Sequence, residues 1–444
     1  MKRSIVGVSA LVVGAVVLAG CSPSVGEGQG DEGEGSGIVK VVLWPGPEGD
    51  AMADVVDDYN EGVGKEAGIT VQMTLLSRQD TFSKEATLMA TKSSDQDIYF
   101  VASYNVGQFS SALDPLTGVD TANYFPVAVD GLSQDGELYA LPLDVSNHFL
   151  LYRQDLIEGL LNDPAQVETY RSVAEQAIGE ARDPKPADQW DWDDFKAMAA
   201  YFSESANPAS PTRYGTILPA KNLLYNTMIW NDVLWGSGGS WTNDAGEANL
   251  NTPEAAAAVN VYADIYTNGW TSPDSSQAEF PETQAALKSG NVAFGLQWSA
   301  GFAELNDPER SPDVAGKIAI ATVPGGKTHV HALAVAMNKY STNKSAARNF
   351  LDYLATTEAM GIYAQSGGIP AMPAVLAANE DLNPAFSQIA ESIDKYGYSV
   401  PVFPNTFQAY SKLAEDLSSA WIGEVPAEEA LATANSDLAN LLQD

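Results

Sequence analysis

The chain has 444 residues, of which 58 are Asp or Glu and only 23 are Lys or Arg, so its formal net charge is −35. Nucleic acids and anionic membranes bind basic surfaces, and this composition therefore argues against both as direct partners. The length exceeds what one hydrophobic core usually supports, and the 45% hydrophobic content is enough for two domains.

The N-terminus has a short positive start followed by an apolar run. Residues 5–19 are almost all apolar or small, as in a secretory signal peptide. The run is shorter than the ~20 residues that a membrane-spanning helix needs. The sequence LAGC that ends it resembles a bacterial lipobox, in which lipid is attached to the cysteine. We therefore predict a lipoprotein signal peptide over residues 1–20 and lipidation at Cys21; an ordinary secretory signal or a membrane anchor is the alternative.

Cys21 is the only cysteine of the chain, so no disulfide can form within it. The stretch that follows, SPSVGEGQGDEGEGSG, is dominated by Gly, Glu and Ser. Such a composition cannot offset the entropy cost of ordering, and its like charges repel each other. We predict a flexible acidic linker over residues 21–37.

The next segment alternates strand and helix patterns. Met52, Val55, Val56 and Tyr59 recur at helical spacing and mark one apolar helix face. The order β-α-β-α-β implies parallel strands, whose ligands bind beyond the carboxyl ends of the strands. The expected strands are residues 38–44, 69–75 and 97–101, and the expected second helix is residues 80–91.

The rest of the chain continues the α/β pattern. Residues 155–182 look helical and polar, like an insertion, and Asp191 is a plausible N-cap for the helix after it. Thr252 and Pro253 open another helix. The stretches RYGTIL, VAFGLQW, KIAIATV and HALAVAM are expected strands, and the last hundred residues are mainly helical.

Several stretches, in chain order, carry a resemblance to a known family: VVLWPG, EATLMATKSSDQDIYFVASY, GELYALPLDVSNHFLLYRQDL, QWDWDDF, ALKSGNVAFGLQWSAGF, and NKSAARNFLDYLATTEAM with SGGIPAMP behind it. Together they resemble the extracellular solute-binding proteins of ABC importers, specifically the sugar-binding group that includes maltose-binding protein. The chain departs from the family at Arg153, where Asn is usual, and in the helical insertion before Trp190.

The resemblance implies an α/β fold of two lobes, each a mostly parallel sheet flanked by helices, hinged at two or three crossings. Carried over to this chain, the N-lobe comprises residues 38–144 and 323–369. The C-lobe comprises residues 145–322 and 370–444. The ligand is expected in the cleft between the lobes, and its binding is expected to stabilise a closed, hinged state.

A carbohydrate ligand needs two kinds of side chain. The C–H face of a sugar ring packs on aromatic rings, and its hydroxyls need fixed donors and acceptors, because an unpaired buried polar group costs about 1–3 kcal/mol. Asp, Asn and Arg side chains can each hold two adjacent hydroxyls. We therefore expect aromatic rings beside short polar side chains at strand ends.

The resemblance implies roles for five residues. Trp298 aligns with the tryptophan that stacks on sugar in the family. Tyr104 and Asn105 lie at positions that resemble a polar pair holding sugar. Asp144 and Ser146, at the first crossing, lie close to a carboxylate contact of the family; the alternative is that they only cap a turn.

Other candidates lie where loops or strand ends are expected to face the cleft: Trp44, Glu48, Arg78, Trp230, Gly367 and Phe403. Trp44 is equally a candidate for the N-lobe core. Trp230 and Trp235 are five apart on one helix, so at most one should reach the cleft, and we choose Trp230. Gly367, with the glycine after it, allows close backbone approach or simply forms a turn.

The enzyme alternatives have weaker support. His329 and His331 are two apart on an expected strand, but no third ligand is evident, so we predict no metal and no cofactor. No Gly-x-Ser-x-Gly motif occurs. A glycoside hydrolase needs two opposed carboxylates, and a chain with this many acidic residues contains such pairs by chance. A secreted glycoside hydrolase is therefore the main alternative class.

We therefore expect a non-enzymatic, substrate-binding lipoprotein of an ABC transporter. It would capture a carbohydrate, which we expect to be an oligosaccharide, and deliver it to membrane permease subunits. We expect a monomer, held by lipid on Cys21 at the outer face of the cell membrane, with no nucleic-acid partner. A secreted glycoside hydrolase, or a binder of peptide or polyamine, is the alternative.

Overall fold

The structure is a computed structural model that describes residues 37–383 and 385–443. The signal peptide over residues 1–20, the lipidation at Cys21 and nearly all of the linker lie outside the described residues. No helix in the described part of the chain is long and apolar enough to cross a membrane.

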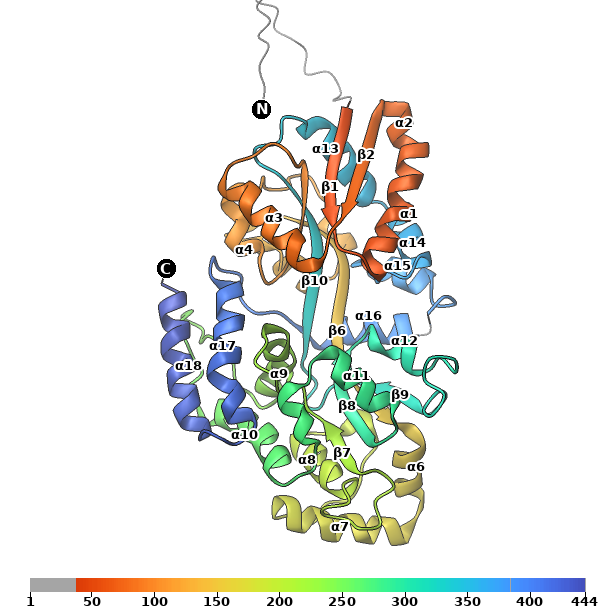
Figure 1. Cartoon of the computed structure of the whole chain (residues 1–444), viewed down its shortest axis with the longest axis vertical. Helices are drawn as coiled ribbons and strands as arrows, with labels where there is room; N and C mark the ends of the chain where they lie inside the picture. Colours follow the sequence, from red (N-terminus) through yellow and green to blue (C-terminus); the bar gives the residue numbers. More distant parts are fainter. Residues whose placement is uncertain (1–36, 384, 444) are drawn as a thin grey trace, which may run out of the picture. The chain divides into compact units, whose positions relative to one another are not determined.

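The N-lobe begins with the β-α-β-α-β unit that the sequence predicts (Figure 1). β1 pairs in parallel with both β2 and β3, so the first strand lies between the other two. The predicted apolar face of the first helix is buried against this sheet. The elements are β1 (Gly37–Leu43), α1 (Pro47–Glu61), α2 (Val63–Ala67), β2 (Ile69–Leu75), α3 (Arg78–Ala90) and β3 (Ile98–Ala102).

A short connecting region leads to the first strand that enters both lobes. Its elements are α4 (Val106–Phe109), α5 (Pro126–Asp130), the small hairpin β4 (Ser133–Gln134) and β5 (Glu137–Leu138), and β6 (Leu141–Arg153). β6 pairs antiparallel with β10 (Thr328–Met337), and β10 also pairs antiparallel with β3. Both strands run from one lobe into the other (Figure 1).

The C-lobe continues the same sheet, whose order is β2-β1-β3-β10-β6-β8-β7. β6 pairs antiparallel with β8 and β9, and β7 is parallel to β8. The sheet is therefore parallel in its outer strands and antiparallel at the crossing. The elements are α6 (Gln154–Asn162), α7 (Pro164–Ile178), α8 (Trp192–Tyr201), β7 (Tyr214–Ile217), α9 (Leu224–Gly236), α10 (Pro253–Thr267), α11 (Phe280–Lys288), β8 (Val292–Trp298), α12 (Gly301–Leu305) and β9 (Ile318–Ala321).

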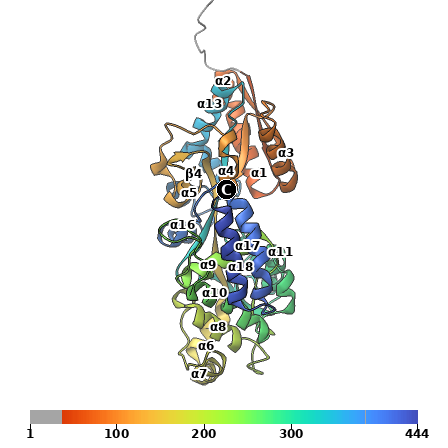
Figure 2. The same ribbon diagram turned by 90° about the vertical axis from the view of Figure 1, so that its left-hand side faces the viewer.

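The C-terminal part is mainly helical, as predicted, and its helices pack on both lobes. Figure 2 shows α17 and α18 side by side, and α17 packs on α9 and α10 of the C-lobe. α15 instead packs on α14, which packs on α1 of the N-lobe. We therefore propose a third crossing after α15 rather than at Pro370. The elements are α13 (Lys344–Leu354), α14 (Thr357–Gln365), α15 (Pro373–Ala378), α16 (Ala385–Tyr396), β11 (Gly397–Tyr398), α17 (Thr406–Trp421) and α18 (Ala427–Leu441).

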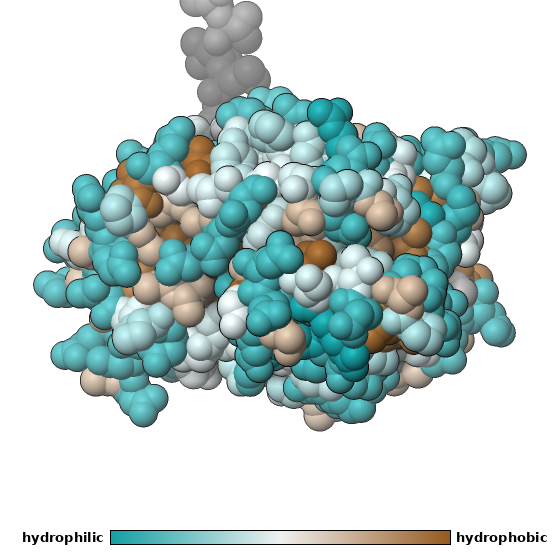
Figure 3. All heavy atoms as spheres, turned by 90° about the horizontal axis from the view of Figure 1, so that it is seen from below, coloured by the Kyte–Doolittle hydropathy of each residue, from teal (hydrophilic) through white to brown (hydrophobic). Residues whose placement is uncertain are grey.

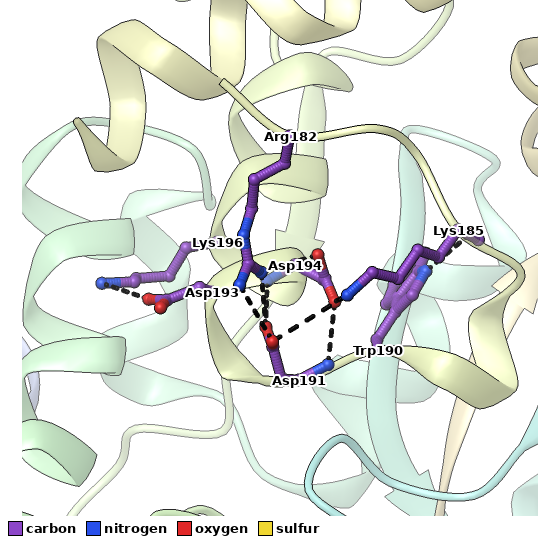
Figure 4. A network of polar contacts seen from close by, with 7 residues as sticks. All are labelled: Arg182, Lys185, Trp190, Asp191, Asp193, Asp194 and Lys196. Carbon is purple, nitrogen blue, oxygen red and sulfur yellow. Dashed lines mark hydrogen bonds and ion pairs between the residues drawn. The ribbon is translucent and has the colours of Figure 1, made fainter. Parts of the chain in front are cut away.

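The expected insertion forms α6 and α7, and an ionic network centred on the buried carboxylate of Asp194 joins it to α8 (Figure 4). Asp194 is 1% exposed and accepts from Arg182 and Lys185, each at 2.7 Å. Asp191 caps α8, as predicted, by accepting from the Asp194 backbone N–H. Burial alone would raise the pKa of Asp191, but the Arg182 guanidinium outweighs it and lowers that pKa to about 2. Seen from the end that carries α7, the surface is mostly hydrophilic with scattered apolar residues (Figure 3).

We predict that Asp194→Ala lowers the free energy of unfolding by about 2–4 kcal/mol, because it leaves two cations without their shared buried carboxylate. Asp193→Ala is the matched control. Its carboxylate is 55% exposed and contacts only Lys196 within this network, at 3.4 Å, so the loss should be at most about 1 kcal/mol. Urea unfolding of both variants tests this, and equal shifts in the two midpoints would contradict it.

Candidate functional site

Aromatic rings from both lobes meet at the carboxyl end of β3. Tyr104, directly after this strand, is 2% exposed. Its ring centroid lies 6.2 Å from that of Tyr225 on α9 and 6.0 Å from that of Phe407 on α17. It also lies 6.0 Å from Phe82 on α3. A residue of the N-lobe is thus surrounded by rings from C-lobe helices, at the strand end where parallel sheets bind ligands.

The two strands that run between the lobes, β6 and β10, lie beside these rings. His331 on β10 stacks on Tyr104, with centroids 5.1 Å apart and planes 8° from parallel. It pairs with Ser146 on β6, so both side chains project from the same face of the sheet. Trp298, at the end of β8, contacts His331 edge-on at 5.8 Å. The arrangement places flat rings and a hydroxyl within one group, which we call the crossing site: Tyr104, Ser146, Tyr225, Trp298, His331 and Phe407.

A buried polar group supports the crossing site from the C-lobe side. Asp232 on α9 has one carboxylate oxygen 2.7 Å from His148 Nδ1, and its other oxygen accepts from the His329 backbone N–H at 2.6 Å. All three side chains are buried, and the His148 ring lies 4.1 Å from Trp298. One carboxylate therefore ties α9 to both crossing strands and fixes the ring behind Trp298.

Burial sets the protonation of these groups. It lowers the pKa of His148 to about 3 and lowers the pKa of His329 well below its usual value, where neighbouring His148 adds to the effect. It also raises the pKa of Asp232, although the His329 N–H opposes that shift. Neither ring nitrogen of His329 has a hydrogen-bond partner among the described residues. Both histidines are therefore uncharged at neutral pH.

A second buried carboxylate lies at the N-lobe side of the crossing. Asp144 on β6 accepts from the Ile369 N–H at 2.8 Å and from the Tyr363 hydroxyl at 3.1 Å. Burial raises its pKa, the nearby Glu48 charge adds to this, and the two hydrogen bonds oppose it. Glu48 is in the first turn of α1 and half-buried. The structure thus brings Asp144 and Glu48 together, as an acidic pair beside the crossing.

Three of the predicted contact residues, Trp44, Asn105 and Trp230, are buried and contact other parts of the protein. Trp44 is 3% exposed and packs edge-on against Phe82 and Phe100, so its surroundings match the core alternative. The Asn105 side chain accepts from the Ala102 N–H at 2.8 Å and holds the turn after β3. Trp230 is 0% exposed in the C-lobe core.

Trp235, not Trp230, is the partly exposed tryptophan of this helix. Its ring stacks on His329, with centroids 5.8 Å apart, and also contacts Tyr398. The five-residue spacing separates the two side chains as expected: Trp230, the residue that we chose, lies in the core, and Trp235 is partly exposed. The helix is buried nearly all round, polar residues included, and its sequence has no amphipathic pattern that identifies an exposed face.

The remaining candidates lie at element ends. Arg78 is the first residue of α3, and its side chain is not described. Phe403 is half-buried just before α17, and its carbonyl oxygen accepts from the Thr406 hydroxyl at 2.7 Å. Gly367 is exposed at φ +98°, two residues after the end of α14, whereas a Cβ on the next residue, Gly368, would meet the Tyr363 ring at 2.0 Å. Gly368 is therefore the position of close approach.

Tyr225, His331 and Phe407 were not predicted as contacts. The sequence analysis considers His331 only with His329, as a possible metal-ligand pair, and predicts no metal there. Strand alternation did place His329 and His331 on one face. Tyr225 and Phe407 reach the site through long-range packing, for which the sequence offered no local signal.

We predict that His329→Phe becomes more stable relative to wild type as the pH falls from 6.5 to 5. The unfolded wild-type chain takes up a proton on this histidine that the folded chain excludes, so acid favours unfolding by about 1–2 kcal/mol over that interval. Phenylalanine keeps the stacking surface but does not titrate. Urea unfolding at several pH values measures the difference, and identical pH dependence of the two proteins would contradict it.

Comparisons with known proteins agree with this architecture. Residues 54–388, more than half of the chain, match the family described as bacterial extracellular solute-binding protein. A probable ABC transporter-binding protein of Deinococcus radiodurans is 22% identical over 84% of this chain and 86% of its own length.

Among solved structures, maltose-bound MalE3 of T. maritima superposes with a TM-score of 0.73 at 19% identity, over 91% of this chain and 99% of its own. A solute-binding protein of Agrobacterium vitis with bound D-mannitol gives a TM-score of 0.68 at 20% identity, over 91% and 98%. These likenesses confirm the two-lobed α/β fold. The family match shows that the chain belongs to the bacterial extracellular solute-binding proteins.

Proposed function

We propose that the protein captures a carbohydrate or a related polyol at the crossing site and delivers it to the permease of an ABC importer. The observation that carries this proposal is the meeting of Tyr104 from the N-lobe with Tyr225 and Phe407 from the C-lobe, above the crossing strands. A ligand held there touches both lobes, so its binding energy favours their approach.

The chemistry of the crossing site suits a neutral polyhydroxylated ligand. Its rings offer flat apolar surfaces to C–H faces, and Trp298 keeps 9% of its surface exposed despite its packing. Ser146 of the crossing site, and the neighbouring acidic pair of Asp144 and Glu48, supply short oxygen groups for hydroxyls. We expect Arg78 and Phe403 to lie at the rim. The two neighbours bound to maltose and to D-mannitol are consistent with this class of ligand.

We further propose that residues 1–20 are removed and that lipid on Cys21 holds the protein at the outer face of the cell membrane. A tether of about the length of residues 21–37 would let the folded part reach a permease. Because the acidic chain would be repelled by an anionic membrane, we propose that attachment depends on the lipid. Metabolic labelling with a fatty acid tests this, and a Cys21→Ser variant should lose both the label and the membrane fraction.

The ligand class is tested by a thermal-shift screen of wild-type protein against mono- and oligosaccharides, polyols, peptides and polyamines. A bound ligand raises the Tm according to its concentration relative to its Kd. We expect shifts with sugars or polyols. Shifts with peptides or polyamines alone would refute the carbohydrate proposal. Incubation with oligosaccharides should yield no new reducing ends; their release would favour a glycoside hydrolase.

We predict that Trp298→Ala weakens binding of the best carbohydrate in this screen by at least about tenfold, because the ligand loses an aromatic face. Tyr266→Ala is the control, since it removes a half-buried ring on α10 that contacts no residue of the crossing site. Isothermal titration calorimetry, performed well below each Tm, measures both. An unchanged Kd for Trp298→Ala would remove this residue from the site.

A further inference from the structure

A very close contact joins the two lobes beside the crossing site. The four-residue helix α4 follows Tyr104 and Asn105, and its second residue, Gly107, is buried against the segment that leads into α17. A Cβ built on Gly107 would lie 2.4 Å from the Phe403 carbonyl oxygen and 3.1 Å from Val402 Cγ1. Carbon and oxygen repel strongly at such a separation. Only glycine fits at this position.

The reason for glycine is space and not backbone conformation. Gly107 is absent from the residues with positive φ in the described part of the chain, so alanine could adopt its helical conformation. The obstacle is also rigid, because it is a backbone carbonyl and not the end of a flexible side chain. Relief of the clash therefore requires a shift of one segment away from the other.

Each partner of the contact is fixed within its own lobe. On the N-lobe side, the Asn105 side chain accepts from the Ala102 N–H and holds α4 to the end of β3. On the C-lobe side, the Phe403 carbonyl accepts from the N–H of Thr406 at 3.1 Å and from its hydroxyl at 2.7 Å. Thr406 begins α17, which packs on α9 and α10. The contact is therefore made only when the lobes approach each other.

We propose that Gly107 is a positioning residue for lobe closure: its missing side chain lets α4 touch the Phe403 carbonyl, and this contact sets how near the lobes come. This inference rests on the proposed capture of a ligand between the lobes. Gly107 is three positions after Tyr104, whose distances of about 6 Å to Tyr225 and Phe407 depend on the same approach. A methyl group at 107 would hold the lobes apart by roughly 0.5–1 Å at this point.

The test uses Gly107→Ala and Gly107→Val, with Gly361→Ala as the matched control. Gly361 lies in α14 of the N-lobe, and a Cβ there meets nothing within 4 Å. We expect Gly107→Ala to weaken binding of maltose or D-mannitol by roughly tenfold or more, and Gly107→Val to weaken it further. The Tm without ligand should stay near that of wild type for Gly107→Ala, because neither lobe alone contains the clash.

A distance measurement keeps this test independent of the ligand. Spin labels on cysteines at Lys84 of α3 and Glu415 of α17, both exposed, report lobe separation in the full chain carrying Cys21→Ser. We expect longer distances in Gly107→Ala than in wild type and in Gly361→Ala. Wild-type distances together with a wild-type Kd in Gly107→Ala would overturn the inference.

The two proposals fail differently. If wild type binds no carbohydrate but Gly107→Ala still lengthens the label distance, the proposed ligand is wrong and the closure role stands. If wild type binds maltose or D-mannitol and Gly107→Ala matches it in both Kd and distance, the ligand proposal stands and the closure role is wrong.

Discussion

The antiparallel pairing of β6 with β10 is the constraint on which the rest of the structure depends. The register runs from Val330 opposite Asn147 to Val335 opposite Leu141, with one irregularity next to Leu333. Both strands continue beyond this ladder into separate halves of the sheet, so each lobe is built on the same two strands. A pair of hydrogen-bonded strands bends more readily than it separates, which allows hinge motion without loss of the shared core.

This pairing also explains why the polar residues at the crossing are buried and still tolerated. A strand that joins two lobes has few places where its side chains can meet water, so charges there must find partners inside the protein. Asp144 meets Tyr363 and the Ile369 N–H, and Asp232 meets His148 and the His329 N–H. Each acid links the crossing to a different lobe, so the hinge is anchored at both ends by hydrogen bonds that a shift of the strands would break.

The sequence predicted what depends on local pattern. The β-α-β-α-β order, the buried face of α1, the Asp191 cap and the strand that ends at Trp298 all follow from periodicity, capping and turn residues, and all are present. The sequence did not distinguish Trp230 from Trp235, because α9 mixes apolar and polar residues without an amphipathic pattern that identifies an exposed face. It also could not identify Tyr225 and Phe407, which reach Tyr104 only through the packing of distant helices.

At the crossing site, too, local sequence pattern and long-range packing act on different residues. Tyr104 is local to one strand end, but its surroundings are supplied by the other lobe, so its burial depends on how closely the lobes approach. Shape at the contact between α4 and the Phe403 segment therefore matters as much as the chemistry of the rings. The Tyr104 ring lies about 6 Å from the rings of Tyr225 and Phe407. A small outward shift of either lobe would therefore reduce the aromatic surface that a ligand can contact. A residue with no side chain, Gly107, thus helps to determine how well aromatic residues several positions away can enclose a ligand.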